Sequence, residues 1–422
     1  MEPRRFLTEL FETAVTAADP MKALEGALPA RPKGRTVVVA LGKGAAQLAA
    51  AFETLWSDPV EGVVVTRYGY AAPCRHLPVL EASHPVPDAA GLEASAAVMR
   101  AVSGLTADDL VVALVCGGGS ALLPAPPEGL TLADEQALNR ALLASGAPIG
   151  VMNAIRKHVS RIKGGRLAAL AHPARVVSLV VSDVPGDDPA QVASGPTVPD
   201  RVDRAQALAM IDARKIVLPE AIMRHISSDA SAAPLPDDPR FAGNEVKVIA
   251  SARLSLEAAA ARAEAQGVPA VILSDAIEGE AHDVGRVHAA IAREVALRGR
   301  PFRAPVVVLS GGETTVTLGT DPGRGGRNTA FLMGLAEGIE DLPGITALAA
   351  DTDGIDGTED NAGAFADGGT FGRLRARGED PRGFVRRQDP YGAFSLLGDI
   401  YAPGPTGTNV NDFRAILIDP QA

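Results

Sequence analysis

Glycine-rich turns follow four apolar runs of this sequence, and charged side chains stand in or beside them. The turns are Gly42-Lys43-Gly44, Gly117-Gly118-Gly119-Ser120, Ser182-Asp183-Val184-Pro185-Gly186-Asp187-Asp188 and Ser310-Gly311-Gly312-Glu313. Bare backbone N–H groups in such turns can bind an anion, although a tight turn needs glycine for steric reasons anyway. One such turn is weak evidence, but four in one chain favour a phosphate-binding site.

The stretch from Val306 to Asn328 (VVVLSGGETTVTLGTDPGRGGRN) adds a second turn to the last of these runs. In it, glycines alternate with two arginines, Arg324 and Arg327. A guanidinium group binds phosphate or carboxylate through two parallel hydrogen bonds. We therefore expect an anion at this turn, with Gly312 and Glu313 beside it.

The segment from Val151 to Leu167 (VMNAIRKHVSRIKGGRL) is the most basic part of the chain. If it is helical from Asn153 onward, Asn153, Arg156, Lys157 and Ser160 share one face. A solvated basic face is the usual explanation of such a run. In a chain with a net charge of −11, beside several anion-ready turns, a binding role is favoured. We assign Asn153, Lys157 and Lys163 to phosphate and Arg156 to the substrate.

Acidic residues at the ends of predicted strands suit Mg²⁺, which takes one or two carboxylates together with substrate phosphates. Asp183 or Asp188 could accept a hydroxyl proton or hold the metal ion, and the sequence does not separate these roles. We assign Asp188 as the base and Asp183, Asp351 and Asp353 as metal ligands. A turn capped by aspartate hydrogen bonds explains the last two equally well. A calcium loop is excluded there because Ile355 occupies a ligand position.

Standard nucleotide motifs are absent. The segment VALGKGA fails the P-loop pattern for two reasons. The position where the pattern requires its first glycine is Val37, and Lys43 is followed by Gly44 rather than Ser or Thr. It fails the dinucleotide pattern because Gln47 stands where a small residue should pack. The residue after the next predicted strand is Arg67 rather than an acid that would bind a ribose hydroxyl. An arginine there could bind the 2′-phosphate of a dinucleotide, so a reductase remains an alternative.

Continuous β-rich apolar runs alternate with alanine-rich helical stretches, which predicts a doubly wound sheet. The runs are 37–41, 62–66, 110–116, 176–181, 246–250, 270–273, 306–309, 345–349 and 415–418, and the clearest helical stretches are 45–55, 89–101, 132–145, 254–266 and 284–297. Prolines and acids interrupt every periodicity at 231–245, which indicates a domain linker or a long crossing loop. We expect an α/β protein with domains at 1–235 and 245–422.

Composition limits the classes of function. The chain has 422 residues, a net charge of −11 without a block of like charge, and two cysteines, Cys74 and Cys116. A nucleic-acid footprint, a membrane-surface footprint and a disulfide framework are therefore not expected. No apolar run approaches the roughly 18 residues that a membrane-spanning helix needs. We expect a cytoplasmic protein.

Three further segments accompany the turns and the basic segment: Ala193-Ser194-Gly195-Pro196-Thr197, Asp351-Thr352-Asp353-Gly354-Ile355-Asp356-Gly357 and Gly404-Pro405-Thr406-Gly407-Thr408-Asn409-Val410-Asn411-Asp412. The set and its order resemble those of the MOFRL-type glycerate 2-kinases. Members of this family are often also labelled hydroxypyruvate reductase. The similarity runs from Gly42 to Asp412. Two departures are Cys116, where serine is expected, and Thr329-Ala330, where Gln-Glu is expected.

The resemblance implies ATP- and Mg²⁺-dependent phosphorylation of D-glycerate to 2-phosphoglycerate, in a cleft between a Rossmann-like N-terminal domain and a smaller C-terminal α/β domain. It implies catalytic roles for Lys43 and Arg327, with Arg324 close enough in sequence for an exchange of roles; we assign Arg324 to the substrate. Gly117, Gly118, Gly119 and Ser120 would bind ATP. Two alternatives remain, an NAD(P)H-dependent hydroxypyruvate reductase and a non-catalytic anion-binding protein. The expected partners are glycerate and ATP, without nucleic acid or membrane, and a homodimer stays open.

Overall fold

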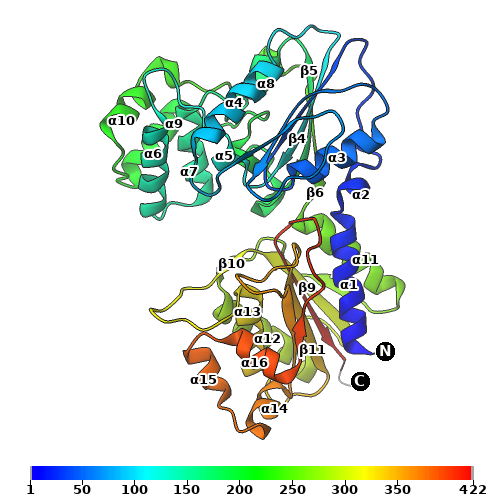
Figure 1. Ribbon diagram of the computed structural model, residues 1–422. Helices are drawn as coiled ribbons and strands as arrows, with labels where there is room; N and C mark the ends of the chain where they lie inside the picture. The colour runs from blue at the N-terminus through cyan, green and yellow to red at the C-terminus, as the bar shows by residue number, and fades with distance from the viewer. Residues whose placement is uncertain (1, 420–422) are drawn as a thin grey trace. The chain divides into compact units, whose positions relative to one another are not determined.

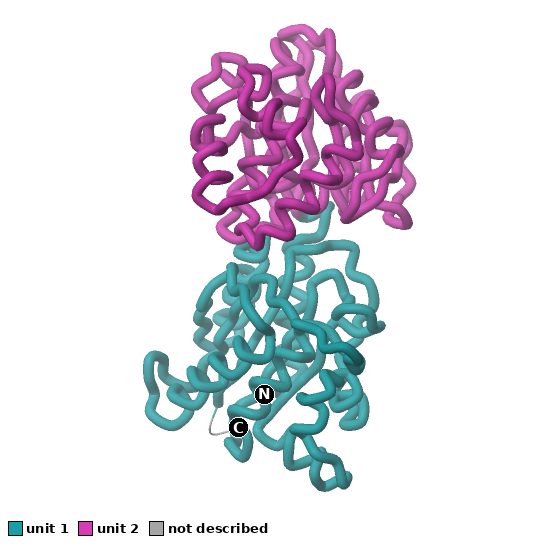
Figure 2. The backbone as a smooth tube through the Cα atoms, turned by 90° about the vertical axis from the view of Figure 1, so that its left-hand side faces the viewer, with its two compact units in different colours: residues 1–22, 250–422 teal, residues 23–249 magenta. Residues whose placement is uncertain are grey.

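The computed structural model describes residues 2–419, which fold into two compact α/β units (Figure 1). The N-terminal unit is Ala23–Ile249, and the C-terminal unit combines Met1–Lys22 with Ala250–Ala422. Figure 2 shows the two units in different colours. The α/β class predicted from the sequence is confirmed.

The N-terminal unit contains a six-stranded sheet of order β3-β2-β1-β4-β5-β6. Its strands are β1 (Thr36–Leu41), β2 (Glu61–Arg67), β3 (Val79–Ala82), β4 (Leu110–Cys116), β5 (Arg175–Val181) and β6 (Glu245–Ala250). The pairs β3–β2, β2–β1, β1–β4 and β4–β5 are parallel, and the first five strands have the order of a Rossmann-like sheet. The turns after β1, β4 and β5 therefore lie along one edge of the sheet.

Helices cover this sheet and extend the unit on one side (Figure 1). They are α3 (Ala45–Leu55), α4 (Ala89–Ala101), α5 (Gly119–Leu122), α6 (Leu132–Ala144), α7 (Ile149–Arg156), α8 (Arg166–Ala171), α9 (Arg204–Ala213) and α10 (Glu220–Ser227), and the short α2 (Pro20–Leu24) precedes β1. Polar caps fix several starts: Asp88 accepts from the backbone N–H of Gly91 at 3.0 Å ahead of α4. Alternate residues of β1 and β4, such as Val37, Val39 and Val111, belong to the core on one face.

The basic segment is not one helix, contrary to the sequence-based expectation. Helix α7 ends at Arg156, and Lys157–Val159 form a single turn of 3₁₀ helix. Gly164 and Gly165 follow with φ of +65° and +79°, which bends the chain before α8. The predicted shared face of Asn153, Arg156, Lys157 and Ser160 therefore forms only in part: Asn153 and Arg156 are hydrogen-bonded on α7, whereas Ser160 lies beyond the 3₁₀ turn in extended backbone.

The C-terminal unit contains a second, mixed sheet of order β13-β12-β11-β14-β9-β7. Its strands are β7 (Ala270–Ile272), β9 (Val306–Gly312), β11 (Ile345–Asp351), β12 (Gly363–Asp367), β13 (Ile400–Tyr401) and β14 (Asp412–Ile418), with β8 (Gly279–Glu280) and β10 (Thr314–Thr315) paired separately. Strand β14 is antiparallel to both β9 and β11, and Asp412 pairs with Gly312 on one side and Asp351 on the other. This register brings three distant segments together.

Each face of the mixed sheet has its own core. Val307 and Leu309 pack on the side of α1 (Pro3–Ala17) and α11 (Ala252–Ala265), whereas Val306 and Val308 pack on the opposite side. The opposite side carries α12 (Ala281–Arg298) and α13 (Arg327–Gly338), with α14 (Thr370–Ala376), α15 (Pro381–Arg386) and α16 (Pro390–Leu397) nearby (Figure 1). The alternation follows from the two-residue period of a strand.

The first 22 residues, expected in the N-terminal domain, belong to the C-terminal unit. Phe6, Leu10 and Phe11 of α1 are buried in the core beneath α11, and the Ser255 hydroxyl donates to the carbonyl of Ala14 at 2.8 Å. The apolar face of this helix therefore covers the mixed sheet of the C-terminal unit. The expected linker at 231–245 also lies within the N-terminal unit, and the division falls at the end of β6, between Ile249 and Ala250.

Candidate active site

The glycine turns after β1 and β4 are packed against each other in the N-terminal unit. The backbone N–H of Lys43 donates to the carbonyl of Gly117 at 2.9 Å. Gly42 has φ of +122°, and a Cβ there would lie 2.3 Å from the carbonyl oxygen of Cys116. These positions need glycine for the close approach of two backbones, before any ligand is considered.

The side chain of Lys43 lies along the Gly118 backbone, because a Cβ on Gly118 would come within 2.8 Å of its Cγ. Among residues 2–419, Lys43 forms no ion pair. Burial, followed by the positive charges of Lys43 and Arg67, lowers the pKa of His84 to about 4. The edge of the sheet beside β1 is therefore a cationic region in which His84 stays neutral at pH 7.

Sequence reasoning did not include His84 or Arg67 in the site. Arg67 ends β2, which pairs with β1, and His84 follows the end of β3, which pairs with β2, so both stand at carboxyl ends of strands on this side of the sheet. The signal was present for Arg67, which directly follows an apolar run. For His84 it was hidden, because β3 is short and only partly buried and was not recognised as a strand.

Ser120, Asn153 and Ser194 form a hydrogen-bonded chain beside the Gly117–Gly119 turn. The hydroxyl oxygens of Ser120 and Ser194 are 2.9 Å apart, and Ser194 donates to Asn153 Oδ1 at 3.2 Å. Ala193 and Ser194 both have positive φ, 52° and 61°, which is rare for residues with a side chain. The structure thus brings together Ser120 and Asn153, two of the predicted phosphate-binding residues, and adds Ser194.

The predicted cations of the basic segment have internal partners. Lys157 pairs with Asp200 and Lys163 with Glu135, each at 2.8 Å, and both lysines are buried. Arg156 donates to Asn139 Oδ1 at 2.8 Å and to Asn153 Oδ1 at 3.1 Å, and burial lowers its pKa. These contacts give each cation a structural role, and ligand binding by them stays a prediction.

Asp183 and Asp188 occupy different settings after β5. The Asp183 carboxylate lies against the first glycine of the turn, since a Cβ on Gly117 would be 1.7 Å from its Oδ2. Burial and the charge of Asp183 together raise the pKa of Cys116 to about 12, so this thiol stays protonated. Asp188 is exposed, and its Oδ1 accepts from the backbone N–H of Ala190 at 3.0 Å, which caps a local turn. Asp183 is therefore the acid next to the glycine turn.

In the C-terminal unit, Arg327 is the first residue of α13 and is held by three carboxylates. Its Nε donates to Asp412 and its Nη2 to Asp351, both at 2.6 Å, and its Nη1 to Glu313 at 3.4 Å. Burial disfavours the guanidinium charge, but Asp412 and Asp351 outweigh it and raise the pKa of Arg327. The guanidinium is thus permanently charged and fixed in direction.

Asp412 was missed as a site residue although it closes the family motif. It is buried and joins Arg327, the amide of Asn328 at 2.9 Å, and the wholly buried Arg414. Arg414 also donates to the Thr314 hydroxyl at 3.1 Å. Two opposite charges in the apolar strand sequence NDFRAILI were the available signal, because buried charges occur in pairs.

Asp356 caps the start of α13 from the DTDGIDG loop. Its carboxylate accepts from the backbone N–H groups of Asn328 and Thr329, both at 2.9 Å, and from the Thr329 hydroxyl at 2.7 Å. Burial raises the pKa of Asp356, whereas these donors oppose the rise. A Cβ on Gly326 would lie 2.4 Å from Asp356 Oδ1, so this glycine is required by the cap. Thr329, a departure from the family pattern, thus strengthens the cap.

Arg324 differs from Arg327 although only two residues lie between them. It donates through Nε to Glu359 at 2.9 Å, its guanidinium carbon lies 4.2 Å from the Tyr391 ring centroid, and its side chain is 62% exposed. The structure therefore separates a fixed, mostly buried arginine from an exposed one that can exchange its partner.

The predicted metal ligands Asp351 and Asp353 are neighbours in the loop after β11. Burial raises the pKa of Asp351 well above its ordinary value, and the nearby Asp353 and Asp412 add to the rise while Arg327 opposes it. Asp353 also accepts from the backbone N–H of Ile355 at 2.9 Å, as expected of a capped turn. No group of three or more His, Cys, Asp or Glu within residues 2–419 is placed to hold a metal ion.

Both halves of this chain are similar in sequence to known protein families. Residues 6–227 match a domain of unknown function (DUF4147), and residues 306–412 match the MOFRL family. A D-glycerate 2-kinase of Thermotoga maritima is 37% identical, with 98% of each chain covered. The chain belongs to the MOFRL-type glycerate 2-kinase family.

Its relatives carry two kinds of name. A glycerate kinase crystal structure from Thermotoga maritima superimposes with a TM-score of 0.89 at 36% identity, covering 98% of this chain and 99% of that one. An Agrobacterium vitis protein is 50% identical over 98% of this chain and 94% of its own length, and its name, hydroxypyruvate reductase, is provisional. The helices of residues 2–419 include none that is long and apolar enough to cross a membrane.

Proposed function

We propose that this protein is a glycerate 2-kinase that transfers the γ-phosphoryl group of ATP to the 2-hydroxyl of D-glycerate. The observation that carries the proposal is the fixed, charged Arg327 guanidinium in a chain related over its full length to a D-glycerate 2-kinase. Phosphoryl transfer asks a protein mainly for positioning and for positive charge around the moving group. Both are supplied by the groups described above.

Lys43 and Arg327 are the proposed catalytic cations. Lys43 lies over the Gly117–Gly119 turn, whose backbone, with Ser120 and Asn153, is the proposed phosphate cradle. Arg327, held by Asp351 and Asp412, meets charge that develops during transfer. Gly312 and Glu313 remain proposed ATP contacts, Arg324 a proposed contact to the glycerate carboxylate, and Asp188 the proposed base.

Mg²⁺ would bind through carboxylates that already crowd one another. The raised pKa of Asp351, with Asp353 and Asp412 contributing, marks an excess of negative charge that a cation relieves. Asp351 and Asp353 would hold the ion together with substrate phosphates, and Asp183 is a third proposed ligand. The ion would supply charge neutralisation at the phosphate oxygens. We place the reaction in the cytoplasm, where the free thiols Cys74 and Cys116 stay reduced.

Purified protein should release ADP from ATP in the presence of D-glycerate and Mg²⁺. It should not oxidise NADH or NADPH with hydroxypyruvate, because the turn after β1 lacks the dinucleotide pattern. The provisional reductase name of the Agrobacterium vitis relative makes this comparison the deciding one. Stoichiometric NAD(P)H oxidation in the absence of ATP would overturn the kinase proposal.

The position of phosphorylation is tested separately. Phosphorus NMR distinguishes 2-phosphoglycerate from 3-phosphoglycerate in the reaction mixture, and enolase alone should convert the expected product to phosphoenolpyruvate. A dominant 3-phosphoglycerate signal would leave a kinase but reject transfer to the 2-hydroxyl.

A further inference from the structure

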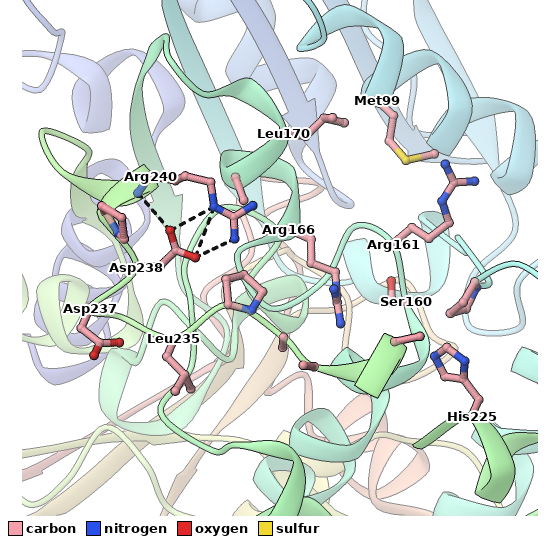
Figure 3. A pocket seen from close by; sticks show the side chains of 17 residues that line it. Met99, Ser160, Arg161, Arg166, Leu170, His225, Leu235, Asp237, Asp238 and Arg240 are labelled. Carbon is pink, nitrogen blue, oxygen red and sulfur yellow. Dashed lines mark hydrogen bonds and ion pairs between the residues drawn. The ribbon is translucent and has the colours of Figure 1, made fainter. Parts of the chain in front are cut away.

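A pocket of about 900 Å³ lies within the N-terminal unit and involves none of the proposed catalytic residues (Figure 3). Its polar lining includes Ser160, Arg161, Arg166, His225, Asp238 and Arg240. Arg161 and Arg166 come from the basic segment, and Asp238 and Arg240 from the loop that precedes β6. Three arginines from two segments distant in sequence therefore line one pocket.

The basic segment divides into neutralised and unneutralised cations. Lys157 and Lys163 are buried against Asp200 and Glu135. Arg161 and Arg166 form no ion pair with any described residue. Arg156 also lacks a carboxylate partner but is bonded to Asn139 and Asn153, so Arg161 and Arg166 are two of three such cations and the two that line the pocket.

Arg166 is the central cation. It is half-buried, and it donates to two carbonyl groups, those of Ser231 at 2.8 Å and Lys157 at 3.5 Å. Burial lowers the pKa of Arg166, and the positive charge of Arg240 lowers it further, so the two guanidinium groups repel each other. A half-buried cation held only by carbonyl groups is incompletely compensated, and an anion beside Arg166 would compensate it and weaken its repulsion with Arg240.

The carboxylates near the pocket leave this charge in place. Asp238 is bound by Arg240 of its own loop, at 2.6 Å, and Asp237 lies on the side away from Arg166 (Figure 3). Arg161 extends toward Met99 on the other side (Figure 3). The pocket therefore keeps a net positive charge around Arg166.

The rest of the lining suits a ligand with an apolar part. Met99, Leu170 and Leu235 are among its apolar residues. The Nε2 atom of His225 is buried without a hydrogen-bond partner among the described residues. A buried polar atom without a partner costs free energy that a ligand or water can recover.

We propose that this pocket binds a phosphate monoester with a small apolar body, with the phosphate between Arg166 and Arg240. Arg240 keeps its ion pair with Asp238, so a dianion, which carries more charge than a carboxylate, can neutralise Arg166 and still bind Arg240. This site is independent of the proposed kinase reaction.

The test is isothermal titration calorimetry of the full chain with phenyl phosphate, benzoate and benzyl alcohol at pH 8. These probes share an apolar ring and carry about two, one and no negative charges. We expect phenyl phosphate to bind at least about tenfold more tightly than benzoate, benzyl alcohol to show no binding, and affinity to fall as salt increases.

Substitutions test whether phenyl phosphate binds in this pocket. Arg166→Gln and Arg240→Gln should each weaken phenyl phosphate binding about tenfold or more, whereas Arg298→Gln, an exposed arginine on α12, should not. Since Arg166 also supports two carbonyl groups, circular dichroism checks each fold, and Arg240→Gln decides alone if Arg166→Gln unfolds. Lys43→Ala should bind as wild type does. Absence of binding, binding that survives Arg240→Gln, or loss in Lys43→Ala would each overturn the proposal.

Discussion

The side chains of the two proposed catalytic cations are held in opposite ways. Arg327 in the C-terminal unit is fixed by Asp351, Asp412 and Glu313, which occupy the ends of two strands and the position after a third. Lys43 in the N-terminal unit lies along a bare glycine turn and forms no ion pair among the described residues. A guanidinium held by carboxylates has a set direction, whereas an unpaired ammonium on a flexible stem can follow a moving phosphoryl group.

This difference shows where stability and activity should be coupled. Substitution of Arg327 removes a catalytic charge and also leaves Asp351 without its cation and Asp412 with Arg414 alone, so both properties should fall. Substitution of Lys43 removes a charge that has no counter-ion among the described residues, so activity alone should fall.

Arg327→Ala should lower kcat by about 100-fold or more and lower stability by roughly 3 kcal/mol. The stability loss follows because Asp351 and Asp412 are both buried and repel each other, and only Arg414, paired with Asp412, would remain to offset their charges. Steady-state kinetics and chemical denaturation measure the two effects. Arg327→Lys should recover part of the stability but little of kcat, since a point charge cannot replace the two-pronged contact. An Arg327→Ala protein with normal kcat would make the residue purely structural.

Lys43→Ala should also lower kcat by about 100-fold, with a much smaller effect on the KM for ATP and no loss of stability. The glycine turns around it are held by backbone contacts, including the Lys43 N–H to the Gly117 carbonyl, which the substitution keeps. Thermal unfolding provides the control measurement. A stability loss as large as that of Arg327→Ala would remove the contrast between the two units.

Mild acid should destabilise the C-terminal unit through His288. Burial lowers the pKa of His288 to about 4, and its hydrogen bond to the Val284 carbonyl only partly opposes this. Because the folded pKa lies below the unfolded value near 6.5, the unfolded chain takes up the proton first as pH falls. The stability is complete above about pH 6.5 and should decrease by about 2 kcal/mol at pH 5.

Urea unfolding of wild type and His288→Gln between pH 7 and pH 5 tests this. The variant should show a shallower dependence on pH, and a matched substitution of the exposed His76 should not. His84, whose pKa also falls to about 4, is the counterpart in the N-terminal unit and is less buried. Equal slopes for wild type and His288→Gln would contradict the assignment.

Arg324→Gln should have the smallest effect. Its side chain is exposed and contacts Glu359 and Tyr391, so stability should change by less than about 0.5 kcal/mol. We expect a several-fold higher KM for glycerate with kcat nearly unchanged, which steady-state kinetics measures. A fall in kcat comparable to that of Arg327→Ala would exchange the roles of the two arginines.

The sequence by itself determined the local elements and their order. Continuous apolar runs gave β1, β2, β4 and β5 within one or two residues, and helical periodicity gave α4 over the same residues that the structure assigns. These patterns depend on neighbours within one element, so they can be recognised without knowledge of the fold. The glycine turns were located for the same reason, because they directly follow strands.

Tertiary structure decided which charges meet. Asp412 reaches Arg327 only because β14 pairs with β9 and β11 in a particular register, between segments about sixty to one hundred residues apart. Lys157 and Lys163 look like ligand-binding cations in the sequence, yet Asp200 and Glu135 neutralise them. Helix α1 covers a sheet whose strands lie far from it in the sequence, and Gly326 leaves room for Asp356. Each of these outcomes depends on contacts between residues far apart in the chain, which local patterns cannot specify.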